Sequence, residues 1–327
     1  MKNKQLSVII PAYNTRDTIE RCIKSIPEKE YVEIIIIDDG STDRLYQYLQ
    51  EKNFLSKNVN YYRQENRGAA YARNVGLQKA TGTYVMFLDS DDYLDTQALE
   101  NVFRDCINNK YDIFYYSFVQ VSETGQKIRG RDLSRFSGIK KADLICYTLA
   151  WNLPWGQFKI INRRLIDKRT IFDETTERCE ELQFTISCLE NSSKIGFSSE
   201  IVYYYVRRYE SLSNSCLYNE ESNKRKELIN KVILKYGDLY ESGVAAFIFA
   251  SYIQYMKIYT EQIDSPQYME FSKYWDDIIR PYLKKVNLRY MRKIYNIFLI
   301  ISRIFGCKWL YKLFIFRKRI VLKDVRI

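Results

Sequence analysis

Short apolar segments alternate with segments of helical spacing along the first third of the chain. Buried strands are predicted at residues 6–10, 32–37, 59–62, 84–88 and 113–118. Helices are predicted between them at residues 15–26, 44–51, 69–79 and 96–106. Strands that alternate with helices form a mainly parallel sheet with right-handed crossovers, so the pattern predicts a Rossmann-like α/β fold.

Polar residues gather where the predicted strands end. Pro11–Asn14, Asp38–Asp43 and Asp89–Asp92 each follow a buried strand directly. In an open parallel sheet, ligands bind beyond the carboxyl ends of the strands. These segments therefore predict one site at one edge of the sheet.

The segment Asp89-Ser90-Asp91-Asp92 is the most informative of the three. Adjacent carboxylates repel one another, so a cluster of them is costly unless a cation lies there. Hard divalent metals take oxygen ligands and bridge phosphate oxygens. The alternative interpretation is a solvated turn that caps the helix predicted from Thr96.

Two further elements carry polar groups toward the same edge. Asp38 and Asp39 can accept hydrogen bonds from a base N–H or from ribose hydroxyls, or Ser41–Asp43 can simply cap the next helix. Arg73 lies one turn into the helix that Gly68 opens. It can reach a base carbonyl or a phosphate, or it can be a surface residue paired with Glu65.

Composition narrows the chemistry. The chain has no His, which removes His ligands, His bases and His-containing triads. Acid–base work must fall to carboxylates, Tyr, Lys or Cys. The seven cysteines form no CxxC pair, so we expect no disulfide framework or zinc site and a reducing cytoplasm.

Four ordered motifs resemble glycosyltransferase family 2. They are SVIIPAYN (7–14), IIIIDDGSTD (34–43), ENRGAAYARNVGL (65–77) and ATGTYVMFLDSDD (80–92). The resemblance implies an inverting enzyme with the GT-A fold. It is dense over about the first 95 residues and thinner to about residue 215.

The resemblance also implies residue roles on the donor side. Asp89 would approach the ribose or the metal, and Asp91 would bind Mn²⁺ or Mg²⁺ directly. The metal would neutralise the leaving diphosphate. The residues that would bind the donor nucleotide are Pro11, Tyr13, Asp38 or Asp39, Asn66, Arg73 and Asp89.

On the acceptor side, the family places its base in a segment that Cys179–Phe184 matches. Glu181 stands where the family usually has Asp, and Glu180 is the second candidate; a charge preference at a helix N-terminus is the alternative for both. Trp155 and Gly156 match a segment near the acceptor. Arg208 and Ser211 match a segment in which Arg208 would clamp the diphosphate.

Charge is concentrated at the end of the chain. The net charge is +11, and residues 280–327 hold 14 Lys and Arg against one acid. Basic residues interleaved with aliphatic and aromatic ones are typical of an interfacial helix on anionic lipid. An oligomer-forming helix and nucleic-acid binding are the alternatives, and the high aliphatic share argues against nucleic acid.

We therefore expect two parts. Residues 1–217 would form the catalytic domain, with a nucleotide-sugar part at 1–95 and an acceptor part at 96–217. Residues 218–327 would form a mainly helical region that ends in the basic tail. No signal peptide or membrane-spanning segment is predicted, so the expected location is the cytoplasm, at the inner face of the membrane.

The predicted function is metal-dependent transfer from a UDP-sugar to a surface glycan, such as capsule, exopolysaccharide or teichoic acid, on a polyprenyl-diphosphate carrier. A nucleotidyltransferase is disfavoured because Pro11–Asn14 lacks a Gly-rich phosphate loop. A dehydrogenase is disfavoured because the same place lacks GxGxxG. A relative that binds nucleotide sugar or membrane without turnover stays open, as does a homo-oligomer.

Overall fold

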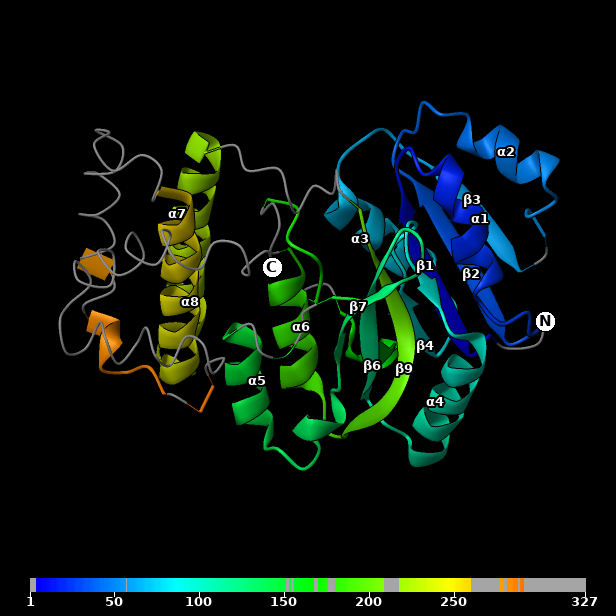
Figure 1. Ribbon diagram of the computed structural model, residues 1–327. Coiled ribbons are helices and arrows are strands. Elements are labelled where there is room, and N and C mark those ends of the chain that lie inside the picture. The colour runs from blue at the N-terminus through cyan, green and yellow to red at the C-terminus, as the bar shows by residue number, and fades with distance from the viewer. Residues whose placement is uncertain are drawn as a thin grey trace. The chain divides into compact units, whose positions relative to one another are not determined.

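The computed structural model describes residues 4–56, 58–150, 153, 156–167, 170–175, 180–208, 218–259, 277–278, 281–287 and 289–290 (Figure 1). Contacts divide the chain into two compact units. The first joins residues 1–139 with 155–215, and the second joins residues 140–154 with 216–327. We expected residues 96–217 to form one acceptor part, whereas residues 140–154 cluster with the C-terminal helices.

The first unit begins with the alternation that the sequence predicts. Its elements are β1 (Leu6–Ala12), α1 (Arg16–Lys24), β2 (Val32–Asp38), α2 (Leu45–Glu51), β3 (Val59–Arg63), α3 (Ala69–Lys79) and β4 (Tyr84–Phe87). The strands pair in parallel in the order β3-β2-β1-β4. β1 and β2 are buried almost throughout, as expected of strands covered on both faces.

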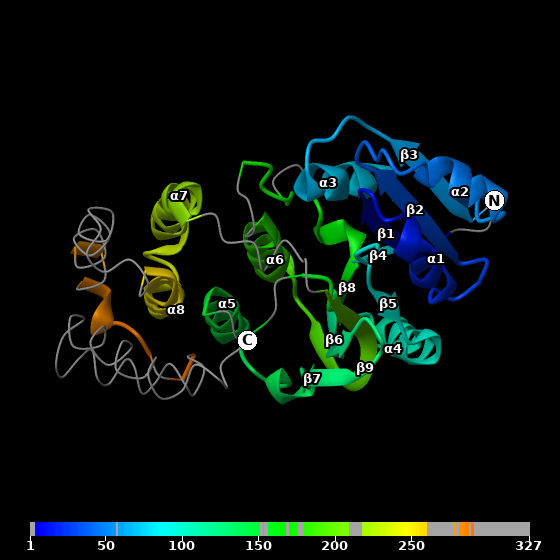
Figure 2. The same cartoon turned by 45° about the horizontal axis from the view of Figure 1, so that its top comes forward.

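The sheet continues beyond β4 with mixed directions (Figure 2). The added elements are β5 (Tyr93–Leu94), α4 (Thr96–Asn109), β6 (Ile113–Ser122), β7 (Lys127–Arg131), β8 (Lys159–Asn162), α6 (Glu180–Asn191) and β9 (Ile195–Arg207). The order is β4-β8-β6-β9-β5, with β7 beside β6. β8 is antiparallel to β4 and β6, whereas β6 and β9 are parallel.

β6 and β7 form a β-hairpin, of which the sequence pattern predicts only the first strand. β7 pairs with β6 in antiparallel register, and a short 3₁₀ helix follows at Ser134–Phe136. β7 reads Lys-Ile-Arg-Gly-Arg and is almost fully exposed, so it carries no apolar alternation that would predict a strand. β7 is a strand because its backbone pairs with β6, which the sequence of β7 alone does not indicate.

Buried Asp112 fixes α6 and β9 relative to the start of β6. Its carboxylate accepts hydrogen bonds from the backbone N–H groups of Ser193 and Lys194, at 2.7 and 3.0 Å. It also pairs with Arg164, just after β8. One carboxylate thus joins the turn between α6 and β9 to the start of β6 and the end of β8.

The second unit is helical as far as it is described. α5 (Lys141–Leu149) packs against α8 (Glu241–Tyr259), and α7 (Tyr218–Tyr236) precedes α8. Asp143 of α5 accepts a hydrogen bond from Tyr290 Oη at 2.7 Å. Within the described ranges, no helix combines the length and apolar character needed to cross a bilayer. Most of the basic tail, including residues 291–327, lies outside the described residues.

Helix α3 lies very close to β1, and Gly76 makes that approach possible. A Cβ built on Gly76 would lie 2.3 Å from Cγ2 of Ile9, which is itself fully buried. The close packing fixes α3 against the sheet. Arg73, one turn earlier on the same helix, is thereby held at the carboxyl edge.

We expect Gly76→Ala to destabilise the first unit by about 1–3 kcal/mol, because the added methyl overpacks a buried contact. Chemical denaturation would measure this free energy of unfolding. Gln78→Ala, on the exposed face of α3, is the matched control and should change it by less than about 0.5 kcal/mol. Equal effects of the two substitutions would contradict the tight α3–β1 contact.

Candidate active site

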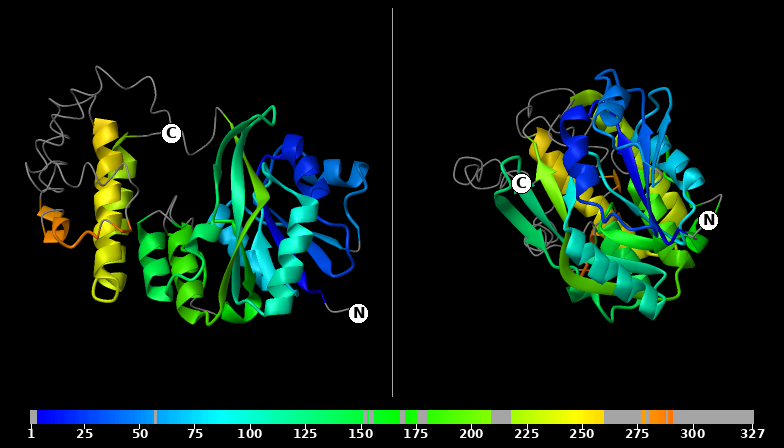
Figure 3. Two further views of the ribbon diagram at one scale, coloured as in Figure 1. Left: turned by 60° about the horizontal axis from the view of Figure 1, so that its bottom comes forward. Right: turned by 90° about the vertical axis from the view of Figure 1, so that its right-hand side faces the viewer.

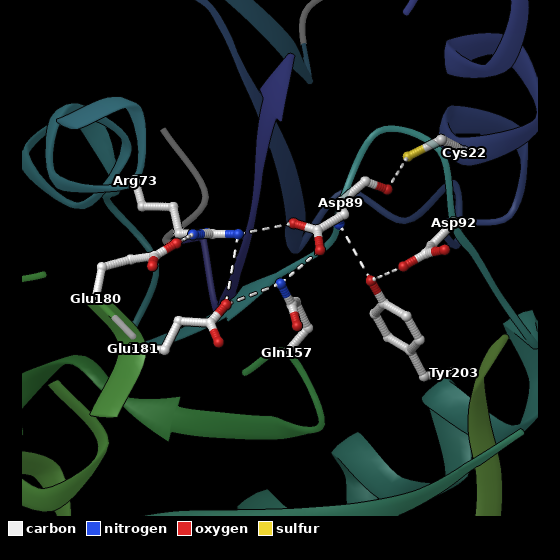
Figure 4. Close-up of polar contacts among 8 residues, drawn as sticks. All are labelled: Cys22, Arg73, Asp89, Asp92, Gln157, Glu180, Glu181 and Tyr203. Carbon is white, nitrogen blue, oxygen red and sulfur yellow. Dashed lines mark hydrogen bonds and ion pairs between the residues drawn. The ribbon is translucent and has the colours of Figure 1, made fainter. Parts of the chain in front are cut away.

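The acidic segment follows β4 at the carboxyl edge of the sheet, and Figure 4 shows two of its members, Asp89 directed toward Arg73 and Asp92 toward Tyr203. It does not cap α4, because Asp95 is the N-cap and accepts a hydrogen bond from the Ala98 N–H. The turn-and-cap interpretation therefore does not account for Asp89, Asp91 and Asp92. Each of these carboxylates has a different environment.

Asp92 is a structural anchor between the segment and β9. Its carboxylate is 1% exposed, accepts a hydrogen bond from Tyr203 Oη at 2.6 Å, and accepts another from the Val206 N–H at 2.7 Å. Tyr203 Oη in turn accepts a hydrogen bond from the Asp89 N–H at 3.2 Å. Burial, followed by the neighbouring acids, raises the pKa of Asp92 well above its usual value.

Asp89 points the other way, toward α3 and α6. Its Oδ1 pairs with a terminal nitrogen of Arg73 at 3.1 Å, and its Oδ2 accepts a hydrogen bond from Gln157 Nε2 at 2.6 Å. Its carbonyl oxygen accepts a long hydrogen bond from Cys22 Sγ at 3.7 Å. Both carboxylate oxygens of Asp89 are thus engaged by side chains of the protein.

Asp91 is the most accessible carboxylate of the three, with 39% of its side chain exposed. Burial and the charge of Asp89 raise its pKa, and Arg208, with Nε at 4.0 Å, lowers it. Arg21 donates a hydrogen bond to its carbonyl oxygen at 2.7 Å. A cation beside this accessible carboxylate would stabilise its ionised form.

Arg73 is at the centre of the site. Its guanidinium pairs with Asp89, with Glu180 at 3.0 Å and with Glu181 at 3.5 Å, so it joins the acidic segment to the start of α6. Its Nε has no hydrogen-bond partner, although it is buried. Burial opposes its charge, and the three carboxylates raise its pKa again, so Arg73 is held as a cation.

Glu181 is a buried carboxylate whose pKa lies near neutrality. Its pKa is raised to about 7: burial is the largest cause, Glu180 and Asp89 also raise it, and Arg73 and Lys159 lower it. Its Oε1 accepts a hydrogen bond from Gln157 Nε2 at 3.2 Å. A carboxylate with such a pKa can exchange a proton near neutral pH.

The segment before β8 shapes the space around Glu181. A Cβ on Gly156 would lie 3.2 Å from both carboxylate oxygens of Glu181, so only glycine leaves that space open. Lys159 donates a hydrogen bond to the Gly156 carbonyl oxygen at 2.6 Å. Gln157 bridges Asp89 and Glu181 from the same segment.

The two acids at the end of β2 are engaged within the protein. Asp38 accepts hydrogen bonds from the Ser41 N–H at 2.7 Å and from Tyr61 Oη. Asp39 accepts from Gln64 Nε2 and from the N–H groups of Arg67 and Gly68, at 2.7, 2.9 and 2.8 Å. Asp39 thereby fixes the loop before α3, where Asn66 lies exposed.

The remaining residues that the sequence analysis singled out do not all lie at the site. Tyr13, at 49% exposure, and half-buried Pro11 lie at the end of β1, next to the Asp38 segment. Asp43 does not cap α2; it accepts a hydrogen bond from the Arg16 N–H of α1. Trp155 and Ser211 lie outside the described residues.

Sequence reasoning missed three residues of this network. Gln157, Tyr203 and Lys159 are buried polar side chains that contact the predicted site or its immediate support. Tyr203 and Lys159 stand in strands, where a polar residue among apolar ones was the available signal. Gln157 carried no such signal, because its neighbours Gly156 and Phe158 do not form a regular pattern.

A metal would have few protein ligands here. Across the described part of the chain, no group of three or more Asp, Glu or Cys side chains is arranged to hold a metal ion. Asp92 is anchored to β9 and Asp89 is bound by Arg73 and Gln157, which leaves Asp91 accessible. A single carboxylate fits Mg²⁺ or Mn²⁺ that takes its other ligands from water and substrate phosphates.

Comparison with known proteins places this geometry in a family. Residues 7–170 match the model of glycosyl transferase family 2. The chain is 28% identical over 259 residues to the poly(ribitol-phosphate) beta-N-acetylglucosaminyltransferase TarP of Staphylococcus aureus, covering 74% of each chain. It is 35% identical over 119 residues to the glycosyltransferase GlyA of Streptococcus pneumoniae, which is 35% of this chain but only 17% of GlyA.

The fold also matches a solved structure. The crystal structure of S. aureus TarS residues 1–349 superposes with a TM-score of 0.67 at 20% identity, covering 96% of this chain and 91% of that one. The match supports the GT-A fold expected from the four sequence motifs. Because the family model extends over about half of the chain and spans all four motifs, the protein belongs to glycosyltransferase family 2.

Proposed function

We propose that the protein is an inverting, metal-dependent glycosyltransferase that moves a sugar from a UDP-sugar to a hydroxyl of a surface glycan. One observation carries the proposal. Glu181, a carboxylate with a pKa near neutrality, is tied through Arg73 and Gln157 to Asp89 of the acidic segment. This arrangement brings a candidate base and a candidate diphosphate site to the same edge of the sheet.

A UDP-sugar is the proposed donor. TarS, which shares the fold at 21% identity, has been solved in complex with UDP-GlcNAc, and TarP is named as an N-acetylglucosaminyltransferase. These relatives favour UDP-GlcNAc among UDP-sugars. Pro11, Tyr13, Asp39 and Asn66 line the loops where the nucleoside would bind.

Asp91 would hold Mn²⁺ or Mg²⁺, and the bound ion would supply positive charge to the leaving diphosphate. Arg208 contributes further positive charge beside Asp91. Arg73 keeps its charge in the buried network and holds Asp89 and both glutamates in place. None of these groups forms a covalent bond with the sugar in a single displacement.

Glu181 would accept the proton of the acceptor hydroxyl as that oxygen attacks the sugar. Its Oε1 is held by Gln157 and Arg73. Gly156 leaves open space against the carboxylate. An inverting transfer is a single displacement, so it needs one base, on the face of the sugar that the acceptor attacks. Glu181 would be that base.

The acceptor is proposed to be a surface glycan carried on polyprenyl diphosphate. Association of residues 280–327 with the inner face of an anionic membrane remains a prediction, as does an oligomeric state. A relative that binds nucleotide sugar without turnover is the second candidate function. The test of Glu181 below distinguishes it from an enzyme.

The base assignment gives a pH prediction. Glu181 must be ionised to accept a proton, and its pKa is raised to about 7, chiefly by burial. We therefore expect kcat/KM to rise with pH through about 7 and then level off. The charged groups that face Glu181 are Arg73, Asp89, Glu180 and Lys159.

We expect Glu181→Gln to lower kcat by roughly 10²–10⁴-fold and to remove the rise in rate near pH 7. The assay is UDP release from UDP-GlcNAc with a cell-wall glycan acceptor, measured from pH 5 to 9. Glu180→Gln is the matched control and should keep that pH dependence. Unchanged transfer by Glu181→Gln would remove Glu181 from the mechanism.

The metal assignment is tested by binding rather than turnover. Calorimetric titration of the protein with UDP should show tighter binding in the presence of Mn²⁺. We expect Asp91→Asn to weaken the Mn²⁺-dependent component by roughly tenfold or more, because it removes the accessible carboxylate ligand. UDP binding that is identical with and without Mn²⁺ would contradict the metal site.

Gln157 is predicted to position the base. Gln157→Met keeps the length of the side chain but removes both hydrogen bonds, so the Glu181 carboxylate loses its orientation. We expect kcat to fall roughly 10–100-fold, while the affinity for UDP changes little because Arg73 still holds Asp89. Gln97→Met, at an exposed position on α4, should leave both unchanged. A parallel loss of UDP affinity and thermal stability would indicate a structural role instead.

A further inference from the structure

β6, β7 and β9 form a three-stranded layer next to the site, with β6 in the middle (Figure 3). β9 connects this layer to the acidic segment. Asp92 accepts hydrogen bonds from Tyr203 Oη and from the Val206 N–H, so it lies beside the last residues of β9. Residues after Tyr203 on β9 therefore continue outward from the site.

Strand register separates this layer into two faces. Residues paired across neighbouring strands point to the same side of a sheet. One side is buried and apolar: Val119, Val121 and Val206 form a cluster, against which Tyr93 and Tyr204 pack. The opposite side carries polar and basic residues.

We call the other side the polar face. β6 pairs Phe118 with Tyr203, Gln120 with Tyr205 and Ser122 with Arg207. On its second edge, β6 pairs Phe118 with Arg131 and Gln120 with Arg129. The polar face thus consists of Gln120, Ser122, Tyr205, Arg207 and Arg129, which lie beyond the aromatic pair Phe118 and Tyr203, and of Arg131, which is level with that pair.

The polar face begins at the site. Phe158, next to Gln157, stacks on Phe118 with ring centroids 3.8 Å apart and meets Tyr203 edge-on at 5.0 Å. Successive residues on one face of a strand are about 6.6 Å apart, and neighbouring strands about 4.8 Å. Along β9, Tyr205 is therefore about 6.6 Å beyond Tyr203, and Arg207 is the same distance again beyond Tyr205. Arg129 lies level with Tyr205 on the other side of β6, because both pair with Gln120.

The charge of this layer is strongly positive. β7 contributes Lys127, Arg129 and Arg131, and β9 ends in Arg207 with Arg208 following. Glu200, near the middle of β9, is the one acid within the three strands. For basic residues on an edge strand such as β7, blocking the pairing of another chain is by itself a sufficient explanation. That explanation is not needed for Arg207, because the outer edge of β9 is already covered just before it: β5 pairs with Tyr203 and Tyr204, and Asp92 accepts a hydrogen bond from the Val206 N–H.

We propose that the polar face binds the acceptor, and that the acceptor is a polymer joined by phosphodiester bonds. Arg129 and Arg207 would contact successive phosphates, since guanidinium groups match phosphate geometry. Tyr205 and Gln120 would contact sugar or polyol hydroxyls between them. The inference rests on the proposed transferase function and adds the acceptor class and its path to Glu181.

Binding and turnover are measured separately. The probe is fluorescently labelled poly(ribitol phosphate), with uncharged dextran as its neutral counterpart. Arg129→Glu combined with Arg207→Glu should weaken polymer binding by on the order of tenfold or more at low salt, and binding by the unmodified protein should weaken as salt rises. Arg104→Glu, a single charge reversal at an exposed position on α4, is the control for each of the two substitutions and should leave binding unchanged.

In the transfer assay, the double variant should raise the KM for the polymer while leaving the KM for UDP-GlcNAc and the melting temperature unchanged. Equal binding by the double variant and the control overturns the polar face as the acceptor surface. Preferential binding or glycosylation of the neutral polymer overturns the acceptor class. Salt-sensitive binding that needs Arg129 and Arg207, without transfer from any UDP-sugar, supports the surface and overturns the proposed function.

Discussion

The ion-pair cluster around Arg73 is the interaction on which the site depends. One guanidinium pairs with a carboxylate from the segment after β4 and with two from the start of α6. The carboxylates come from parts of the chain about 90 residues apart. Without the cation, three acids would be forced together in a largely buried space, which costs several kcal/mol for an unpaired buried charge.

The same cluster explains the unusual protonation of Glu181. Within about 4 Å of a permanent cation a carboxylate normally has a lowered pKa. Here burial and two neighbouring acids outweigh Arg73 and Lys159, and the pKa is about 7 instead. Arg73 therefore assembles the carboxylates without neutralising all of them, which leaves one able to take a proton near neutral pH.

The sequence predicted the parts of the site that local pattern encodes. The strands β1 to β4, the helices between them and the acids at their carboxyl ends all follow from apolar periodicity and strand-end chemistry. The β7 hairpin, the roles of Gln157 and Tyr203, and the grouping of α5 with the C-terminal unit did not follow. Each of these depends on a partner far along the chain, such as β6 for β7 or Asp92 for Tyr203.

The length of the acidic segment constrains the shape of the sheet. β5 lies four strand positions from β4, or about 19 Å across a flat sheet. The six steps from Phe87 to Tyr93 reach about 20 Å only when fully extended. The segment is not extended, because the Asp92 N–H bonds the Asp89 carbonyl oxygen at 3.0 Å and closes a turn.

The sheet must therefore curl to bring β5 and β9 toward β4. This curl encloses Asp92 against Tyr203 and Val206 and leaves Asp91 toward solvent. A short acidic segment that joins distant strands thus gives adjacent carboxylates different environments. The division of roles among Asp89, Asp91 and Asp92 follows from strand order as much as from the acidic residues themselves.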